Sequence, residues 1–569
     1  MFSLNFVVFI LSFFLILISV LGYGFLYQRI NGICQNLNFG YLGILGIFFL
    51  TTYSYLSNLF LAHSQFHNSI IIIIGIVIFI FHLFKSLDKH KLKLEFCVCA
   101  LLFIVLFFSL LMIKNHDDFS YYHFQYTYYL TQDAFSFGVG QFNHGFRTPS
   151  SIFYLNSLFY LPFVDYYLFN FSSVLILGFT NIILLEKIDI SFTKIKFSKA
   201  SKEIFFVKYL CLFTLVFINI FFYRISEHGT DRSAQILIFL LIIELFEFFL
   251  KKDLQKYRLI FLYFLFGLIV SLKAFYFLYL VFLIPIFFFV LKNKKSFYLT
   301  FSYLFFNRYF LFVFLLLCLV IFTYFSNTGC LIYPLNITCF EKLKWTIPSL
   351  EVIHMNNWYE LWSKGGANPN YRVQNPDQYI QGFNWINHWF DEYFFNKVSD
   401  FILGILLVIF VFYFVFLRLN TKSKFYILNK FVIYAYLIIF FIFIEWFYNH
   451  PSLRYGGYCV IALLFFIPNS YILSSYNIDI KKYGQSVLLL VFLTFIIFMI
   501  RNINRLDNEI KKYQYEPLKK TFYLIDEKYF TIQKKMNVMK KKYEECKKLS
   551  LDCSKYKISK VYSKFIFEY

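Results

Sequence analysis

The sequence predicts an all-α membrane protein, a polytopic transmembrane bundle of about 12–14 helical spans. Hydrophobic residues make up 59% of the 569 positions and charged residues only 15%, against roughly 25% in an ordinary soluble protein. Phe alone occupies 85 positions and Tyr 47, and a soluble fold has no interior large enough to bury so much apolar surface. Apolar runs of spanning length also recur along the whole chain. Soluble, disordered, collagen-like, coiled-coil and disulfide-scaffold proteins are excluded as the main class.

Fourteen apolar runs are expected to be spans, because about 20 helical residues cross a hydrocarbon core of ~30 Å. Some runs are short, and 259–291 can form one bent span, so the expected number of spans is given as about 12–14. The first run lacks a basic leading region and a small-residue cleavage site, and we interpret it as a retained span. The runs are 3–22, 41–61, 70–84, 95–113, 170–185, 204–222, 233–250, 259–272, 275–291, 309–325, 400–418, 430–447, 457–473 and 486–500.

The distribution of Lys and Arg orients the bundle. The connections 85–94, 186–203, 251–258, 292–308, 418–430 and 474–485 contain 23 of these residues in 78 positions, whereas 62–69, 114–151, 223–232, 271–275, 326–399 and 448–456 contain 11 in 144. Because cytoplasmic loops carry the basic excess, the first set is expected inside and both termini outside. The same rule accounts for most of the net charge of +22, so nucleic acid is not an expected partner.

The C-terminal tail, residues 501–569, carries conflicting signals. It has 18 Lys and Arg against 9 acidic residues, with six of the basic residues in its first twenty positions, and this alone would place it inside. Two close cysteine pairs, Cys330/Cys339 and Cys546/Cys553, fall in segments placed outside, and paired cysteines in short loops suit an oxidising compartment. We therefore expect two disulfides and an external tail, the alternative being four unrelated free thiols.

Trp and His are concentrated in the outer segments. Aromatic belts form at both membrane interfaces, so a one-sided cluster favours a polar ligand site at the outer surface over a simple belt. Aromatic faces are good platforms for sugar rings and lipid chains. The residues are Trp345, Trp358, Trp362, Trp385, Trp389 and Trp446, with His63, His67, His116, His123, His144, His228, His354, His388 and His450.

The first outer loop contains the strongest candidate for catalysis, the stretch from Lys114 to His123. Asp117 and Asp118 are adjacent carboxylates at a helix end, which is unfavourable unless they are solvated, paired or metal-bound. Adjacent side chains point to different faces, so one of the two is a candidate general base toward an acceptor hydroxyl, with His123 completing the catalytic group. The alternative is a solvated loop start.

Later in this loop, His144 and Arg147 offer hydrogen-bond donors for an anionic or polyhydroxyl ligand. A second outer group lies in the turn from Arg224 to Arg232. There Glu227 and Asp231, together with a carboxylate of the first loop, either hold a divalent cation such as Mg²⁺ or Mn²⁺ or pair with the two arginines. The spacing of Cys and His shows no zinc pattern.

Two further groups suit a phosphate. Lys273 is a single cation between two apolar runs, where it either snorkels or faces a cavity. His450, Arg454 and Tyr455 lie in an outer turn, and Arg454 opens a helix whose N-terminal amides and dipole favour anions.

These stretches resemble a family of bacterial polytopic membrane proteins of unknown function. The matching stretches are Asp117–His123, Glu227–Arg232, Cys330-Leu-Ile-Tyr-Pro and His450–Tyr458. More distantly, the layout resembles the GT-C glycosyltransferases, which use polyprenyl-phosphate-linked sugars at the outer face. The resemblance implies a first acidic outer loop, helices lying on the membrane, and a second acidic loop two spans later. It also implies that Lys273 and Arg454 contact the carrier phosphate.

The leading hypothesis is a GT-C-like transferase in the inner (cytoplasmic) membrane of a bacterium, acting on a lipid-linked sugar at its outer side. Asp117 or Asp118 would be the base, Glu227 and Asp231 metal or acceptor ligands, and Arg232, Lys273 and Arg454 would neutralise the leaving phosphate. The alternatives are a transporter or flippase of lipid-linked glycans and a non-catalytic assembly subunit; the oligomeric state is left open. The expected organisation is three extra spans in 1–94, a core in 95–500 with outer loops 114–169 and 326–399, and the tail 501–569.

Overall fold

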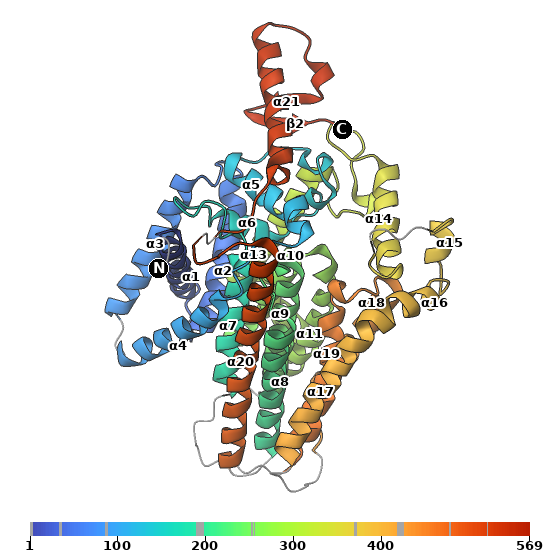
Figure 1. The fold of residues 1–569 in the computed structure, drawn as a ribbon. Helices are drawn as coiled ribbons and strands as arrows, with labels where there is room; N and C mark the ends of the chain where they lie inside the picture. The colour runs from blue at the N-terminus through green and yellow to red at the C-terminus, as the bar shows by residue number, and fades with distance from the viewer. Residues whose placement is uncertain are drawn as a thin grey trace.

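A computed structural model describes residues 4–33, 37–85, 89–188, 199–251, 254, 256–368, 373–417, 426–476, 480–519 and 522–569 (Figure 1). Within these ranges the chain is mostly helical, and the one sheet is an antiparallel pair, β1 (Ile558–Val561) and β2 (Lys564–Phe567). Twelve of the described helices are long and apolar enough to cross a membrane. The predicted all-α, multi-pass class is therefore confirmed.

The first helices form a tightly packed unit at one side of the bundle, with α1 lying against both α2 and α3. A methyl group at Gly22 of α1 would collide with the backbone carbonyl of Gly75 in α3, so the close approach of these helices requires glycine there. The helices are α1 (Leu4–Ile30), α2 (Phe39–Asn58), α3 (Gln65–Lys85) and α4 (Lys89–Phe107).

The central helix of the bundle is α9, which contacts α7, α8, α10, α18 and α19. Nearly all its side chains from Thr230 to Phe249 are buried, as expected for a helix that is apolar all round. The helices of this part of the chain are α7 (Phe171–Ile188), α8 (Lys199–Phe221), α9 (Gly229–Leu250), α10 (Lys256–Leu272), η4 (Ala274–Phe282), α11 (Leu283–Lys294), α12 (Phe297–Phe305) and α13 (Arg308–Thr328).

The last spans complete the bundle. One is a continuous helix formed by α16 (Ile386–Trp389), the π-helical stretch η6 (Phe390–Val398) and α17 (Ser399–Leu417), and the others are α18 (Lys430–Asn449), α19 (Gly457–Ser474) and α20 (Ile480–Tyr513). Much of the basic connections 186–203 and 418–430 lies outside the described residues. The structure describes the helices on either side of these two connections but only part of the connections themselves.

Each of the fourteen expected runs overlaps a helix. However, α4 and α10, which overlap the runs 95–113 and 259–272, are not among the twelve described helices that are long and apolar enough to cross a membrane. Two boundaries also differ clearly. The run 95–113 leaves the helix at Phe107, and the remaining apolar residues, such as Leu111 and Ile113, are buried within the protein. The run 486–500 is part of α20, which continues without a break to Tyr513. At 1.5 Å per residue α20 is about 50 Å long and extends well beyond a ~30 Å core.

The long loops 114–169 and 326–399 contain short helices, and both gather at one end of the bundle, which we call the loop face (Figure 1). The first loop contains η1 (Phe119–His123), α5 (Phe124–Gln132), η2 (Val139–Gln141), η3 (His144–Phe146) and α6 (Ser151–Ser157). The second contains η5 (Asn336–Thr338), α14 (Ser349–Lys364) and α15 (Pro376–Ile380) before α16.

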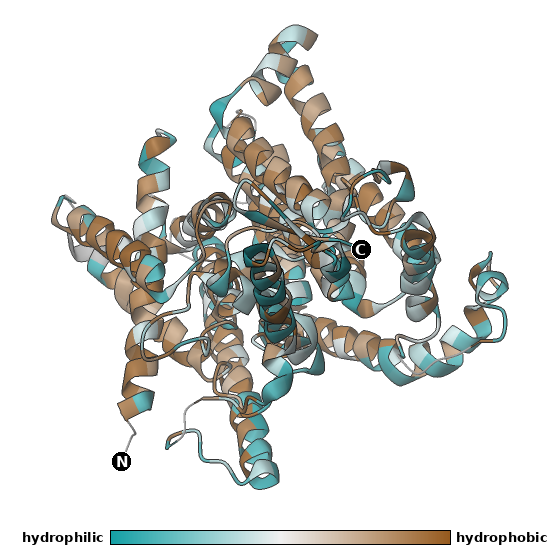
Figure 2. Ribbon diagram, turned by 90° about the horizontal axis from the view of Figure 1, so that it is seen from above, coloured by the Kyte–Doolittle hydropathy of each residue, from teal (hydrophilic) through white to brown (hydrophobic). Residues whose placement is uncertain are grey.

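The C-terminal tail lies on the loop face as well. Lys540 of α21 (Thr531–Lys548) pairs with Asp133 at 2.6 Å, and Ile566 of β2 bridges to Phe137. Two short helices flank α21, namely η8 (Glu527–Phe530) and η9 (Ser554–Tyr556). Seen from above, the helices of the bundle are mostly apolar whereas α21 is mostly polar (Figure 2).

Candidate functional site

Four charged side chains from four separate segments meet at the loop face. Arg454 contacts Asp118 through Nη2 at 2.6 Å and Asp231 through Nε at 2.5 Å. Lys273 forms an ion pair with the other oxygen of Asp231. We call these residues the loop-face quartet. Its two carboxylates and two cations are formally neutral together.

Each member of the quartet lies at or beyond the end of a spanning helix. Asp118 directly precedes η1, Asp231 lies in the first turn of α9, and Lys273 separates α10 from η4. Arg454 belongs to η7 (Leu453–Tyr455), which precedes α19. The polar groups are therefore gathered where the bundle meets its outer loops.

The turn that carries Arg454 is fixed by hydrogen bonds to its backbone. The indoles of Trp389 and Trp446 donate to the carbonyls of Pro451 and Ser452 at 2.8 and 2.9 Å. Gln235 of α9 donates to the carbonyl of Arg454 at 3.2 Å. These contacts show that part of the Trp enrichment on this face supports the turn and is not free to bind a ligand.

The quartet is only partly shielded from solvent. The side chains of Arg454, Asp118 and Lys273 are 30%, 26% and 24% exposed, whereas Asp231 is 9% exposed. Burial by itself raises the pKa of Asp118, but the charge and hydrogen bond of Arg454, together with the nearby His123 and His116, hold that pKa below its ordinary value. Burial and Arg454 lower the pKa of Lys273, while its contact with Asp231 favours the ammonium form.

Histidines and tyrosines surround the quartet. His116 lies 3.7 Å from Asp118, and its ring meets His228 edge-on at 4.6 Å. His123 is buried without a hydrogen-bond partner at Nε2, and burial lowers its pKa to about 3, so it is neutral at physiological pH. The Tyr455 ring lies 5.4 Å from the ammonium of Lys273.

The structure separates the adjacent carboxylates Asp117 and Asp118. Asp117 is 91% exposed and its nearest cation is Lys114 at 3.7 Å, whereas Asp118 is turned toward Arg454. The sequence predicts that only one of these two carboxylates serves a site, and it does not indicate which one. The geometry selects Asp118.

Glu227 does not join Asp231. It is buried and bound by Arg224 and by Arg505 of α20, the latter at 3.1 Å. Arg232 donates to the carbonyl of Arg224 at 3.2 Å and lies over the Phe222 ring, so it too is outside the quartet. With Asp231 held by two cations, and with no group of three potential ligands among the described residues, the side chains present do not fit a resident Mg²⁺ or Mn²⁺.

The two expected ligand donors of the first loop lie apart from the quartet. Arg147 is buried, where it donates to the Tyr333 hydroxyl at 2.7 Å and pairs with Glu351. Glu351 in turn accepts from the hydroxyl of Tyr569 near the chain end. Arg147 therefore joins both outer loops to the tail, and its guanidinium is occupied by protein groups, while His144 is exposed.

His450 lies nearer to the quartet. Its ring is 6.0 Å from that of Tyr455, its Nδ1 has no hydrogen-bond partner, and burial lowers its pKa to about 4. The structure also links Cys330 to Cys339 and Cys546 to Cys553 by disulfide bonds. Both bridges lie in the loop-face segments.

A second charge cluster, which the sequence analysis does not predict, joins α7, α9 and α10 toward the opposite end of the bundle. Lys187 of α7 contacts Glu244 and Glu247 of α9 at 2.8 and 2.9 Å, and Arg258 of α10 contacts the same two carboxylates. We call these four residues the opposite-end quartet. The sequence carries a signal for this cluster. Glu244 and Glu247 lie three residues apart inside an apolar run, and their partners Lys187 and Arg258 are basic residues next to neighbouring apolar runs.

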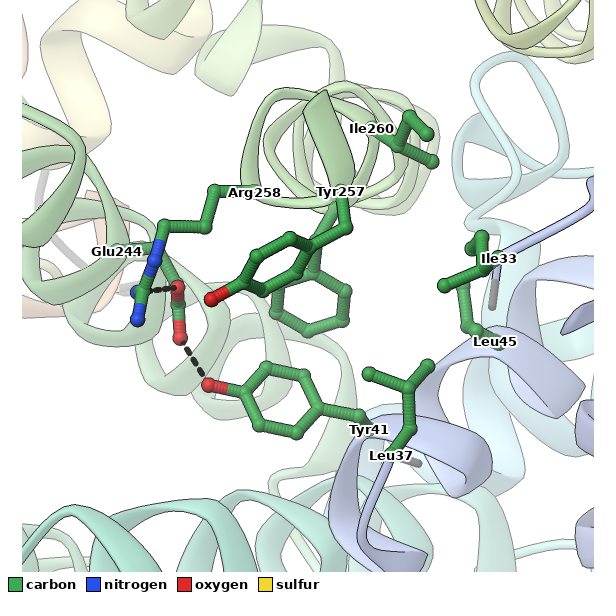
Figure 3. Close-up of a pocket in the computed structure, with 9 residues that line it drawn as sticks. Ile33, Leu37, Tyr41, Leu45, Glu244, Tyr257, Arg258 and Ile260 are labelled. Atoms are coloured by element: carbon green, nitrogen blue, oxygen red, sulfur yellow. Dashed lines mark hydrogen bonds and ion pairs between the residues drawn. The ribbon is translucent and has the colours of Figure 1, made fainter. Parts of the chain in front are cut away.

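A pocket lies beside the opposite-end quartet, between α2 and α10. Tyr41 donates to Glu244 at 2.7 Å at its polar side, and Leu37, Leu45 and Phe261 are among its apolar walls (Figure 3). A second pocket, near the loop-face quartet, includes His123 and the first turn of α9 in its lining. The first pocket is thus distant from the residues expected to carry chemistry, whereas the second lies beside them.

The comparisons with known proteins identify a family without assigning an activity. Residues 6–461 match a family described as "Domain of unknown function (DUF8201)". Since this match covers most of the chain, the chain belongs to that family. Neither the curated proteins nor the solved structures contain a match.

Proposed function

We propose that this member of the DUF8201 family transfers a sugar from a polyprenyl-phosphate donor to a lipid or glycan acceptor at the loop face. The observation that carries the proposal is the loop-face quartet. Two cations able to bind a phosphate and a carboxylate able to act as a base meet in a partly exposed site at the ends of spanning helices. A donor with its carrier chain in the bilayer would present its phosphate at this level.

In the proposed reaction the donor phosphate competes with the carboxylates for Arg454 and Lys273. Binding of the phosphate releases Asp118 from Arg454 and lets it accept a proton from the acceptor hydroxyl. The acceptor oxygen then forms a bond to the anomeric carbon as the bond between that carbon and the phosphate oxygen breaks. The polyprenyl phosphate leaves with its negative charge stabilised by Arg454 and Lys273.

The proposal requires the loop face to lie outside the cytoplasm. We place the protein in the inner (cytoplasmic) membrane of a bacterium, with the loop face toward the cell envelope. The supporting argument is the excess of Lys and Arg in connections at the opposite end of the bundle. The distant similarity of layout to GT-C glycosyltransferases points the same way.

The second candidate is a transporter or flippase of lipid-linked glycans. Buried ionisable groups within membrane-spanning helices are typical of transport pathways, and the opposite-end quartet consists of such groups. We rank it lower because acid and base in that quartet are paired on neighbouring helices. A non-catalytic assembly subunit would need neither quartet to change partners.

The test is a substitution of Asp118 with its neighbour as the control. The purified protein in lipid nanodiscs is given polyprenyl-phosphate-linked hexoses and a lipid extract as acceptor, and products are detected by mass spectrometry. Asp118→Asn should lower the rate of transfer by roughly 10²–10⁴-fold, the contribution of a general base. Asp117→Asn removes an equal charge one residue away and should leave the rate near that of the wild type.

Two results would contradict the proposal. Equal rates for the two variants would remove the base role of Asp118. Movement of the intact lipid-linked sugar between leaflets, without any transfer product, would favour the flippase.

A further inference from the structure

Helix α20 extends beyond the bundle, and its outer part lies against the ends of two other helices. Arg501 donates to the carbonyl of Ile220 at 2.6 Å, and Asn502 donates to the carbonyl of Tyr223 at 3.2 Å. These carbonyls belong to the end of α8 and the residues just after it, where no helical partner remains. A cation there also stabilises the negative end of the helix dipole.

One turn further along α20, Arg505 reaches the segment that follows α4. Its Nη2 donates to the carbonyls of Leu111 and Phe108 at 2.6 and 3.2 Å. Another turn on, Glu509 accepts from the amide of Ile113 at 2.7 Å. Three backbone groups of the irregular stretch between Phe107 and Asp118 therefore have partners in α20, namely the carbonyls of Phe108 and Leu111 and the amide of Ile113.

Arg505 also contacts the second acidic segment. Its Nη1 lies 3.1 Å from Glu227, which is buried and bound in addition by Arg224. One guanidinium thus joins the segment after α4 to the turn before α9. Asp118 follows Ile113 by five residues, and Asp231 follows Glu227 by four.

We infer that Arg505 is a positioning residue that fixes the Asp118 segment and the Asp231 turn relative to one another. It touches neither carboxylate of the loop-face quartet and acts through the backbone and through Glu227. The significance for catalysis rests on the proposed function, whereas the positioning itself is independent of it. In this arrangement Glu227 orients the guanidinium of Arg505.

The test measures hydrogen–deuterium exchange of the full-length protein in nanodiscs, without any substrate. In Arg505→Ala, amides in 108–118 and in 224–231 should exchange faster together, by roughly tenfold, since both segments lose charged hydrogen bonds that hold them closed. Arg501→Ala is the matched control, because Arg501 contacts the end of α8 but not the segment after α4. That variant should leave 108–118 unchanged.

Arg505→Lys covers the case in which Arg505→Ala does not fold. Lysine keeps a charge beside Glu227 but lacks the fork that reaches both segments, so one of the two segments should remain protected and the other should not. Faster exchange in neither segment, in either variant, would overturn the inference. Faster exchange spread evenly over all loop-face segments would overturn it as well.

Kinetics with the same polyprenyl-phosphate-linked hexoses give the second readout. Arg505→Lys should lower kcat by roughly tenfold to a hundredfold through misplaced carboxylates, with the KM for the donor nearly unchanged because Arg454 and Lys273 remain. If exchange changes as expected but no variant alters any transfer, the positioning stands and the proposed function fails. If Asp118→Asn abolishes transfer while hydrogen–deuterium exchange in the Arg505 variants is unchanged, the proposed function stands and the positioning role of Arg505 fails.

Discussion

The two quartets contain the same chemistry, two carboxylates and two cations, at the two ends of α9 and α10, but they differ in what holds them. In the opposite-end quartet every residue belongs to a helix, and the side chains of Glu244 and Lys187 are 1% and 6% exposed. In the loop-face quartet Asp118, Lys273 and Arg454 lie outside the spanning helices and are about a quarter exposed or more, with Asp118 at 26%.

Ion pairs of similar composition therefore suit different purposes, depending on the segments that hold them. A buried pair on rigid helices has no water to replace a lost partner, so it holds the helices in register. A partly exposed cluster on turns can exchange one partner for a ligand, because solvent and the ligand both compensate for the lost contact. The loop-face quartet is thus suited to binding, and the opposite-end quartet to support.

The largest expected effect is on stability at the opposite end. Glu244→Gln leaves Lys187 and Arg258 sharing one carboxylate in a buried environment, and we expect a loss of about 3–5 kcal/mol in the free energy of unfolding. Asp118→Asn in the loop-face quartet should lose at most ~1 kcal/mol, as for exposed pairs. Denaturant titration in detergent measures both, and similar losses would abolish the distinction between the quartets.

The next effect concerns binding at the loop face. Lys273→Ala removes one of the two cations proposed to bind the donor phosphate, and affinity for a polyprenyl-phosphate-linked hexose should fall by roughly 10–100-fold, the usual contribution of a charged hydrogen bond. Lys114→Ala removes an exposed lysine that pairs with Asp117 on the same face. Titration in nanodiscs should show wild-type affinity for this control, and equal weakening in both variants would indicate only a loss of general attraction.

A smaller effect is expected from pH through His123. Burial lowers its pKa to about 3 in the folded protein, whereas an unfolded histidine titrates near 6.5. The unfolded state therefore binds more protons between these values, and stability is lost as the pH falls from about 6.5 toward 3. Between about pH 6.5 and 5, His123→Gln should lose roughly 1–2 kcal/mol less stability than the wild type in thermal melts. Parallel pH dependence of the two proteins would show that His123 is not held neutral.

The last test involves no change in energy. In a Cys-depleted background, Asn368→Cys near the loop face should react with an impermeant thiol reagent on intact cells, and Lys199→Cys at the start of α8 only after permeabilisation. The reverse pattern would place the loop-face quartet in the cytoplasm and remove its access to an external acceptor.

Much of the fold could be predicted because hydropathy is a local property. An apolar run of about 20 residues dictates a spanning helix wherever it occurs, so each expected span overlaps a helix. The expectation failed at 108–113, where the apolar side chains are buried against protein and not lipid. Hydropathy does not distinguish these two environments.

The class, most of the span positions and the gathering of acids, Trp and His in a few outer segments follow from the local sequence. The tertiary structure brings Asp118 and not Asp117 to Arg454, and it pairs Glu227 with Arg505 and not with Asp231. It also shows that Arg501 and Arg505, two basic residues whose charge alone predicts an internal tail, bind backbone carbonyls at the loop face. The physical reason is range: burial in a bilayer is decided within one helix, whereas an ion pair such as Asp231 with Arg454 joins residues 223 positions apart and depends on how every helix between them packs.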